Sequence, residues 1–107
     1  MIVDVRTYRT RPRALHAMLD LYEKTGLAVQ TRHLGPPLAY LYTDVGELNT
    51  YMHLWVYESA ADREAKRAAL AKEPEWQEYL RASGEAGYLV HQSNRLMVPA
   101  KFAPIAR

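Results

Sequence analysis

Two histidines and one arginine in this chain have side chains that could act on a small molecule. His53 lies between Tyr51 and Trp55 in an alternating segment. A histidine in an aromatic pocket could act as a general base, because its pKa lies near working pH. Arg32 and His33 adjoin after the first predicted helix, and a guanidinium there could hold the carboxylate or enolate of a substrate. We hypothesise that Arg32, His33 and His53 share one cavity and act as a catalytic unit.

Each of these residues also has a purely structural interpretation. His53 could be a hydrogen-bonded histidine within an interface. Arg32 and His33 end a helical segment, where both side chains would favour the negative end of the helix dipole. Four further aromatic side chains could wall a bound aromatic substrate or form the core of a dimer: Tyr40, Tyr42, Tyr51 and Trp55.

The sequence offers little for metal, nucleotide or nucleophilic chemistry. It has no cysteine, which excludes disulfides, thiolate metal sites and a cysteine nucleophile. Its four histidines are scattered, without the His-x-His or His-x-x-x-His spacing of metal ligands. Glycine-rich phosphate loops and Gly-x-Ser-x-Gly motifs are absent. We therefore expect a site that uses no metal and no cofactor.

Length and composition indicate one soluble globular domain over residues 1–107, with 49% hydrophobic and 24% charged residues. The net charge is only +2 and no basic run occurs, so we expect no nucleic-acid partner. No stretch approaches the roughly 18 apolar residues of a membrane span, and no leader opens the chain. These features predict a cytoplasmic protein with no membrane contact. Eight tyrosines against one phenylalanine suggest aromatic surfaces that are partly exposed to solvent.

Hydrophobic periodicity predicts a β-α-β-β-α-β order in which the second helical stretch is broken in two. Thr25-Gly26 is either the stop of the first helix or a kink in it. A short connection joins the second and third strands as an antiparallel hairpin, and Ser59 is the predicted N-cap of the helix that follows. This order is that of a ferredoxin-like α+β fold, an antiparallel sheet with helices on one face. The expected strands are 2–9, 38–45, 50–58 and 88–98, and the expected helices are 12–24, 27–34, 60–72 and 75–82, with a loop at 83–87.

The two faces of the predicted sheet differ in composition. We expect the helices to cover an aliphatic set consisting of Val3, Val5, Leu41, Val45, Met52, Leu54, Val56, Leu96 and Val98. The opposite set is aromatic with a few polar residues: Arg6, Tyr8, Tyr40, Tyr42, Tyr51, His53, Trp55, Tyr57, His91 and Arg95. An exposed aromatic patch of this size is typical of an interface or a ligand site. It predicts a twofold homodimer, although a slip of one residue would exchange the two faces.

Several segments resemble the NIPSNAP family, and the resemblance covers nearly the whole chain. The opening strand Ile2–Tyr8, the segment Gln30–Gly35 after the helix and the hairpin segment Leu48–Ser59 carry it. The shorter pieces Asp62-Arg63-Glu64, Pro74-Glu75-Trp76 and Gln92–Pro99 complete the match. Only the combination of these segments is specific. The resemblance implies the dimeric α+β barrel superfamily, in agreement with the element order.

The resemblance leaves the function open between two classes. The superfamily includes cofactor-free monooxygenases, polyketide cyclases, haem-degrading oxygenases and small isomerases, and the first strand lacks the asparagine that haem degradation uses. One hypothesis is a homodimer that binds or transforms a small planar molecule, aromatic or carboxylated, without metal. The alternative is a non-catalytic interaction or scaffolding dimer, which the association of animal members with mitochondria and vesicle traffic implies.

Overall fold

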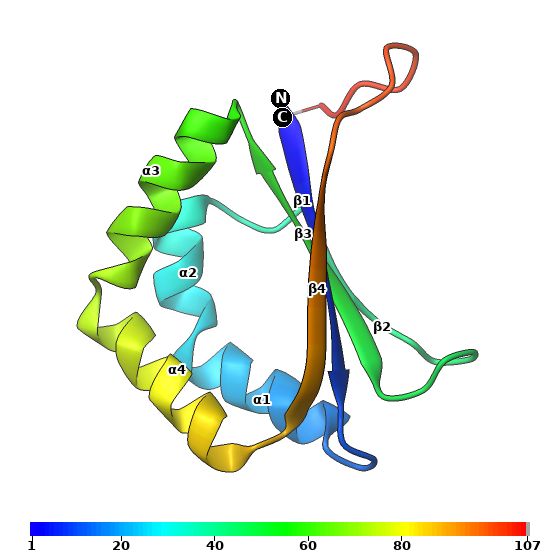
Figure 1. Cartoon of the computed structure of the whole chain (residues 1–107), viewed down its shortest axis with the longest axis vertical. Coiled ribbons are helices and arrows are strands. Elements are labelled where there is room, and N and C mark those ends of the chain that lie inside the picture. The colour runs from blue at the N-terminus through cyan, green and yellow to red at the C-terminus, as the bar shows by residue number, and fades with distance from the viewer. Residues whose placement is uncertain (107) are drawn as a thin grey trace.

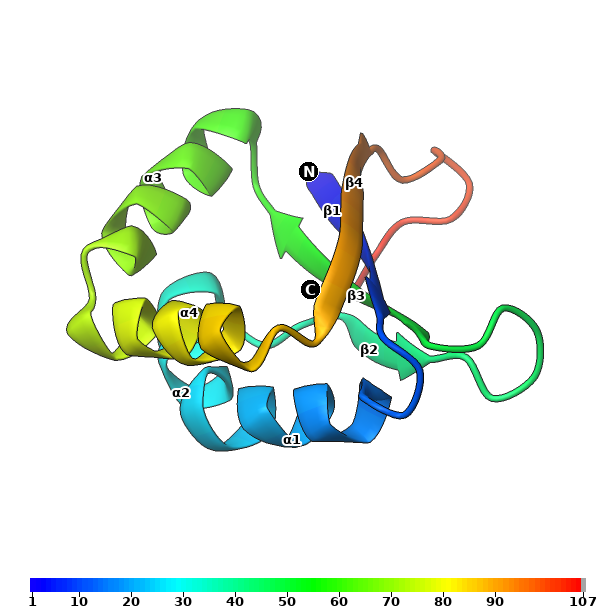
Figure 2. The ribbon, with the colours of Figure 1, turned by 60° about the horizontal axis from the view of Figure 1, so that its bottom comes forward.

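The computed structural model describes residues 1–106 and confirms the α+β fold and the ferredoxin-like element order. One antiparallel sheet has the strand order β2-β3-β1-β4, and all four helices lie on the same side of it (Figures 1 and 2). The strands are β1 (Ile2–Thr10), β2 (Ala39–Tyr42), β3 (Thr50–Tyr57) and β4 (Leu89–Met97). The helices are α1 (Leu15–Thr25), α2 (Leu27–Leu34), α3 (Ala60–Ala71) and α4 (Pro74–Ala86). No helix within residues 1–106 is both long and apolar enough to cross a membrane.

The first helix begins later than the sequence predicts. Ala14 donates its backbone N–H to the carbonyl of Arg11 at 3.1 Å, which closes a turn. Arg13 in this turn has a φ of 70°, a left-handed conformation that an α-helix cannot contain. Pro12 therefore belongs to the turn and not to the first turn of α1, which starts at Leu15.

Glycines mark two other helix boundaries. Gly26 separates α1 from α2, and a Cβ at this position would lie 2.9 Å from the ring of Tyr22. The loop predicted at 83–87 is wrong, because α4 continues to Ala86 and ends at Gly87 with a φ of 65°.

The predicted cap of α3 is confirmed, since the hydroxyl of Ser59 accepts the backbone N–H of Asp62 at 3.1 Å.

The prediction of which sheet face meets the helices is wrong. The register pairs Tyr8 with Tyr51 and Arg6 with His53, so these residues share one face, and that face packs against the helices. Trp55 on the same face is only 1% exposed. The helices present aromatic side chains of their own toward the sheet, so the core is aromatic. Alternation separates the two faces, but it does not say which of two apolar faces is covered.

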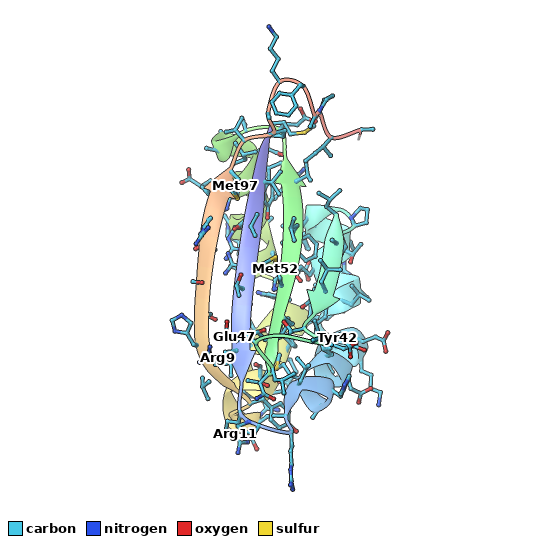
Figure 3. The ribbon with its side chains drawn as sticks, turned by 90° about the vertical axis from the view of Figure 1, so that its right-hand side faces the viewer. Arg9, Arg11, Tyr42, Glu47, Met52 and Met97 are labelled. Atoms are coloured by element: carbon cyan, nitrogen blue, oxygen red, sulfur yellow. The ribbon has the colours of Figure 1, made fainter. Side chains whose placement is uncertain are left out.

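The face without helices is the aliphatic one, which Figure 3 shows in front of the helices with Met52 and Met97 labelled. Met52 is 36% exposed, Met97 49% and Leu41 56%. The assignment of β4 residues also changes. Met97 pairs with Val3 on the open face. Arg95 and His91 pair with Val5 and Arg9, so they belong to the open face as well, whereas Leu96 lies opposite Asp4 on the helix side.

Candidate functional site

Rings from three adjacent strands form a wall on the helix-facing side of the sheet. Tyr40 of β2, Tyr51 and His53 of β3 and Tyr8 of β1 share this side, because the register places them on neighbouring strands with the same parity. The imidazole of His53 stacks on Tyr40, with 4.6 Å between ring centroids, and on Tyr8 at 5.0 Å. Tyr22 of α1 stacks on Tyr40 from the helix layer at 5.0 Å. Mutual stacking therefore fixes the orientation of the rings.

A cavity of about 250 Å³ adjoins this ring wall. Its volume falls just below the range of roughly 300–1,000 Å³ typical of ligand pockets, so it suits a molecule of about one ring. All eight helices and strands contribute to it. The lining residues are Arg6, Tyr8, Tyr22, Gln30, Tyr40, Tyr51, His53, Arg67, Trp76, Tyr79, Leu80, Ser83, Leu89 and Gln92.

Two guanidinium groups give this cavity a positive character. Arg6 donates to the hydroxyl of Tyr8 at 3.1 Å and to the carboxylate of Asp4 at 3.2 Å. Burial disfavours the charged form of Arg6, but Tyr8 and Asp4 outweigh it and raise its pKa. Arg67 of α3 forms no ion pair with a carboxylate within residues 1–106. No aspartate or glutamate in that range lines the cavity, although Asp4 partly compensates the charge of Arg6. An anionic ligand would therefore meet the guanidinium of Arg67 and the remaining N–H groups of Arg6.

Asp4 holds Arg6 in place from outside the cavity lining. Its side chain is 0% exposed and accepts hydrogen bonds from Arg63 at 3.0 Å and Asn94 at 3.0 Å in addition to Arg6. Burial alone would raise the pKa of Asp4, but the Asn94 bond, the charge of Arg6 and the contact with Arg63 together lower it. Asp4 therefore stays ionised and orients Arg6 without lining the cavity.

His53 is neutral at ordinary pH. The residue is 5% exposed, and its Nδ1 accepts the indole N–H of Trp55 at 2.6 Å. Burial lowers the pKa of His53 to about 3, and the positive charges of Arg6 and Arg67 act in the same direction. Burial also raises the pKa values of the surrounding tyrosines, so their hydroxyls keep their protons.

The structure does not bring Arg32 and His33 together with His53. Nε2 of His33 lies 2.9 Å from the carboxylate of Glu73, and Arg32 pairs with Glu75 at 3.1 Å, so both residues tie the end of α2 to the start of α4. Neither lines the cavity that contains His53. The hypothesis that these three residues form one unit is wrong in its geometry, because the last turn of α2 faces the junction of α3 and α4.

The four aromatic residues predicted to bind a ligand separate into two groups. Tyr40 and Tyr51 line the cavity. Trp55 lies outside the lining and contacts His53 edge-on at 5.9 Å between centroids. Tyr42 is 51% exposed and contacts His16 of the first helix at 5.2 Å, beside a separate surface groove.

The described residues contain no cluster that suits a metal ion. Within residues 1–106, no three histidine, aspartate or glutamate side chains come together as possible ligands. The cavity instead offers guanidinium, amide, imidazole and phenol groups, which are suited to holding an organic anion by hydrogen bonds.

The sequence of this chain matches the sequence model of the NIPSNAP family over residues 3–104. The chain belongs to the NIPSNAP family.

Its relatives include longer NIPSNAP proteins. The chain is 35% identical over 75 residues to a NipSnap homologue of Dictyostelium discoideum, an alignment that covers 70% of this chain and 33% of that protein. It is 34% identical over 76 residues to human NipSnap homolog 3A, covering 70% and 30%. This NIPSNAP chain therefore spans about a third of the length of these curated relatives.

Solved structures of other NIPSNAP proteins share the whole fold. Protein Atu4242 from Agrobacterium tumefaciens superposes with a TM-score of 0.92 at 32% identity, covering 99% of this chain and 100% of that one. A NIPSNAP-like domain protein from Burkholderia xenovorans gives 0.90 at 40% identity, covering 99% and 90%. An antibiotic biosynthesis monooxygenase gives 0.62 at 16% identity, covering 94% and 99%, which shows a common fold alone.

Sequence patterns missed two NIPSNAP cavity residues, Arg67 and Gln30, and misjudged the surroundings of Arg6. Arg63 and Arg67 are four residues apart on α3, so they share a helix face, which was the available signal. Gln30 gave no such signal, because a glutamine in an amphipathic helix is ordinarily exposed. Arg6 belongs to the aromatic set that the sequence predicts on the open face, whereas the structure places it against the helices.

Proposed function

We propose that this NIPSNAP protein binds a small planar anion of about one ring, aromatic or carboxylated, in the cavity beside the ring wall. The observation that carries the proposal is the presence of two guanidinium groups, those of Arg6 and Arg67, in a cavity whose described lining has no carboxylate. Guanidinium groups hold carboxylates with directed hydrogen bonds. Aromatic side chains of the lining, among them Tyr8, Tyr40 and Tyr51, supply apolar contact area for a ring. In its catalytic form, the proposal is that the protein acts as a cofactor-free oxygenase or cyclase. We further propose that the protein is located in the cytoplasm.

Calorimetric titration with benzoate tests this proposal, with benzylamine as a cation of similar size and shape. We expect benzoate to bind and benzylamine not to bind. Arg67→Gln should weaken benzoate binding about tenfold or more, the loss typical of a hydrogen bond to a charged group. Arg81→Gln is the matched control, because Arg81 lies on α4 and pairs with Glu78 and Glu85 outside the cavity. Equal affinities in the two variants would contradict the proposal.

A second candidate function is a homodimer that serves as an interaction or scaffolding unit. The observation that favours it is the open aliphatic face, where Met52, Leu41 and Met97 are exposed on a sheet without helices. A second copy would bury this face by a self-complementary contact.

Light scattering tests the dimer. We expect a mass of twice the 12.3 kDa chain for the wild type and a single-chain mass for Met52→Glu, because a charge would be buried without a partner. Val45→Glu is the control, since Val45 is 90% exposed and lies outside the strands. A wild-type mass of one chain would exclude the dimer.

A further inference from the structure

Two buried side chains of the cavity have their acceptor atoms occupied by protein donors. Nδ1 of His53 accepts the indole N–H of Trp55 at 2.6 Å, and the amide oxygen of Gln30 accepts the hydroxyl of Tyr22 at 2.6 Å. His53 is 5% exposed and Gln30 4%. Imidazole and amide groups can each donate and accept hydrogen bonds. In both side chains a protein donor occupies the accepting atom, whereas the donating nitrogen makes no hydrogen bond to the part of the protein that the structure describes.

The contact with Trp55 fixes the tautomer of His53. An indole nitrogen only donates, so Nδ1 must carry the lone pair and the proton of the neutral ring must lie on Nε2. Protonation of Nδ1 would set two N–H groups against each other. The low pKa of His53, which burial and the nearby arginines produce, keeps the ring neutral.

The donating atoms have no partner in the protein. Within residues 1–106, no group accepts a hydrogen bond from Nε2 of His53 or from the amide nitrogen of Gln30. Neither atom is sealed from solvent, since in the same residues only the hydroxyl of Tyr57 is fully buried without a partner. Both side chains line the cavity. A ligand oxygen can therefore satisfy each donor.

We infer that the cavity recognises an oxyanion, either a carboxylate or an enolate, through Nε2–H of His53 and the amide N–H of Gln30. Trp55 and Tyr22 act as positioning residues for these donors. This inference rests on the proposed anion-binding function and extends it. His53 serves as a hydrogen-bond donor to the ligand and not as the general base that its sequence context indicates. The site discriminates against ammonium groups, which would meet N–H donors and guanidinium charges.

The tautomer is measured directly by ¹⁵N NMR of the imidazole at pH 7 in the wild-type protein. We expect His53 as the Nε2–H tautomer, both free and with benzoate bound. Trp55→Phe should produce a mixture of tautomers, a change that a purely structural role of Trp55 would not cause. An Nδ1–H tautomer in the wild type would overturn the inference. Because this measurement uses the wild-type protein, it does not depend on whether a variant folds.

Two amide substitutions test the role in binding. His53→Gln places an amide donor near the position of Nε2, whereas His53→Asn places its amide near Nδ1, where its oxygen can accept from Trp55. We expect His53→Gln to bind benzoate within about threefold of wild type and His53→Asn to bind at least tenfold more weakly. Equal affinities in these variants would overturn the inference while leaving the proposed function intact.

The two proposals fail in different ways. If no benzoate binds to the wild type, the proposed function fails, and the NMR tautomer still decides whether His53 is held as a donor. If benzylamine binds as well as benzoate, the recognition of an oxyanion is wrong even though the cavity takes a ligand.

Discussion

Replacing Asp4 by asparagine should lower the free energy of unfolding by about 3 kcal/mol. Asp4 is 0% exposed and compensates the charges of Arg6 and Arg63, at 3.2 and 3.0 Å. Breaking a buried ion pair typically costs about 3–5 kcal/mol. The two arginine side chains are 15% and 23% exposed, so water offsets part of the loss, and the variant keeps one acceptor oxygen. These corrections place the expected cost at the lower end of that range.

Urea denaturation followed by circular dichroism at pH 7 measures this cost, and the melting temperature should fall by about 12 °C, at roughly 4 °C for each kcal/mol. Asp20→Asn is the matched control, because Asp20 is 55% exposed and pairs with an exposed lysine, Lys24. It should leave stability unchanged within error. A loss below about 1 kcal/mol for Asp4→Asn would refute the view that this carboxylate holds the arginines.

The stability difference between the wild type and Asp4→Asn should also depend on pH, and the pKa of Asp4 gives the sign of this dependence. The folded-state pKa of Asp4 lies below its ordinary value of 3.8. Its ionisation therefore stabilises the fold fully above pH 3.8, and this contribution is lost as the pH falls through the folded-state pKa. The stability difference between wild type and Asp4→Asn should narrow below pH 4. A difference that widens in acid would contradict this assignment.

Substitutions at four further positions test the packing and the α3 cap. Tyr57→Phe removes a buried hydroxyl that has no hydrogen-bond partner among residues 1–106, so urea denaturation should show no loss and a gain of up to about 1 kcal/mol. Ser59→Ala should cost about 1 kcal/mol through loss of the α3 cap, whereas glycine at the same position should cost only a few tenths, and a reversed order would be inconsistent with capping. Gly26→Ala places a Cβ 2.9 Å from Tyr22 and should cost about 1–3 kcal/mol by thermal melting, whereas Gly84→Ala, with no atom within 4 Å, should be stabilising.

Local patterns predicted most of the secondary structure because each element follows its own period. The strand β3 alternates over its whole length, and the α3 cap is encoded next to its helix. The covered face of the sheet was not predictable in this way. Met52 and Trp55 belong to opposite faces, and both are apolar enough for a core. The choice depends on the aromatic residues of helices that are distant in sequence.

The candidate site was partly predictable for a similar reason. His53, Tyr40 and Tyr51 share a cavity because strand alternation and hairpin register bring them together. The separation of His33 from them could not be read from the sequence, because its partner Glu73 is 40 residues away. A histidine at the end of a helix can be assigned to a site only when the side of the helix that faces the site is known.

The position of β1 in the centre of the sheet has a consequence for the order in which the domain is made. This strand is synthesised first, yet it pairs with β4, the last strand, and Asp4 bonds Asn94 across 90 residues of chain. Until β4 has left the ribosome, one edge of β1 stays open and the carboxylate of Asp4 lacks the hydrogen bond from Asn94. Closing so long a loop is entropically slow, and an unpaired strand edge invites association with other chains. The nascent domain is therefore most vulnerable to aggregation just before its last strand is delivered, and a chain that ends before β4 keeps this exposed edge permanently.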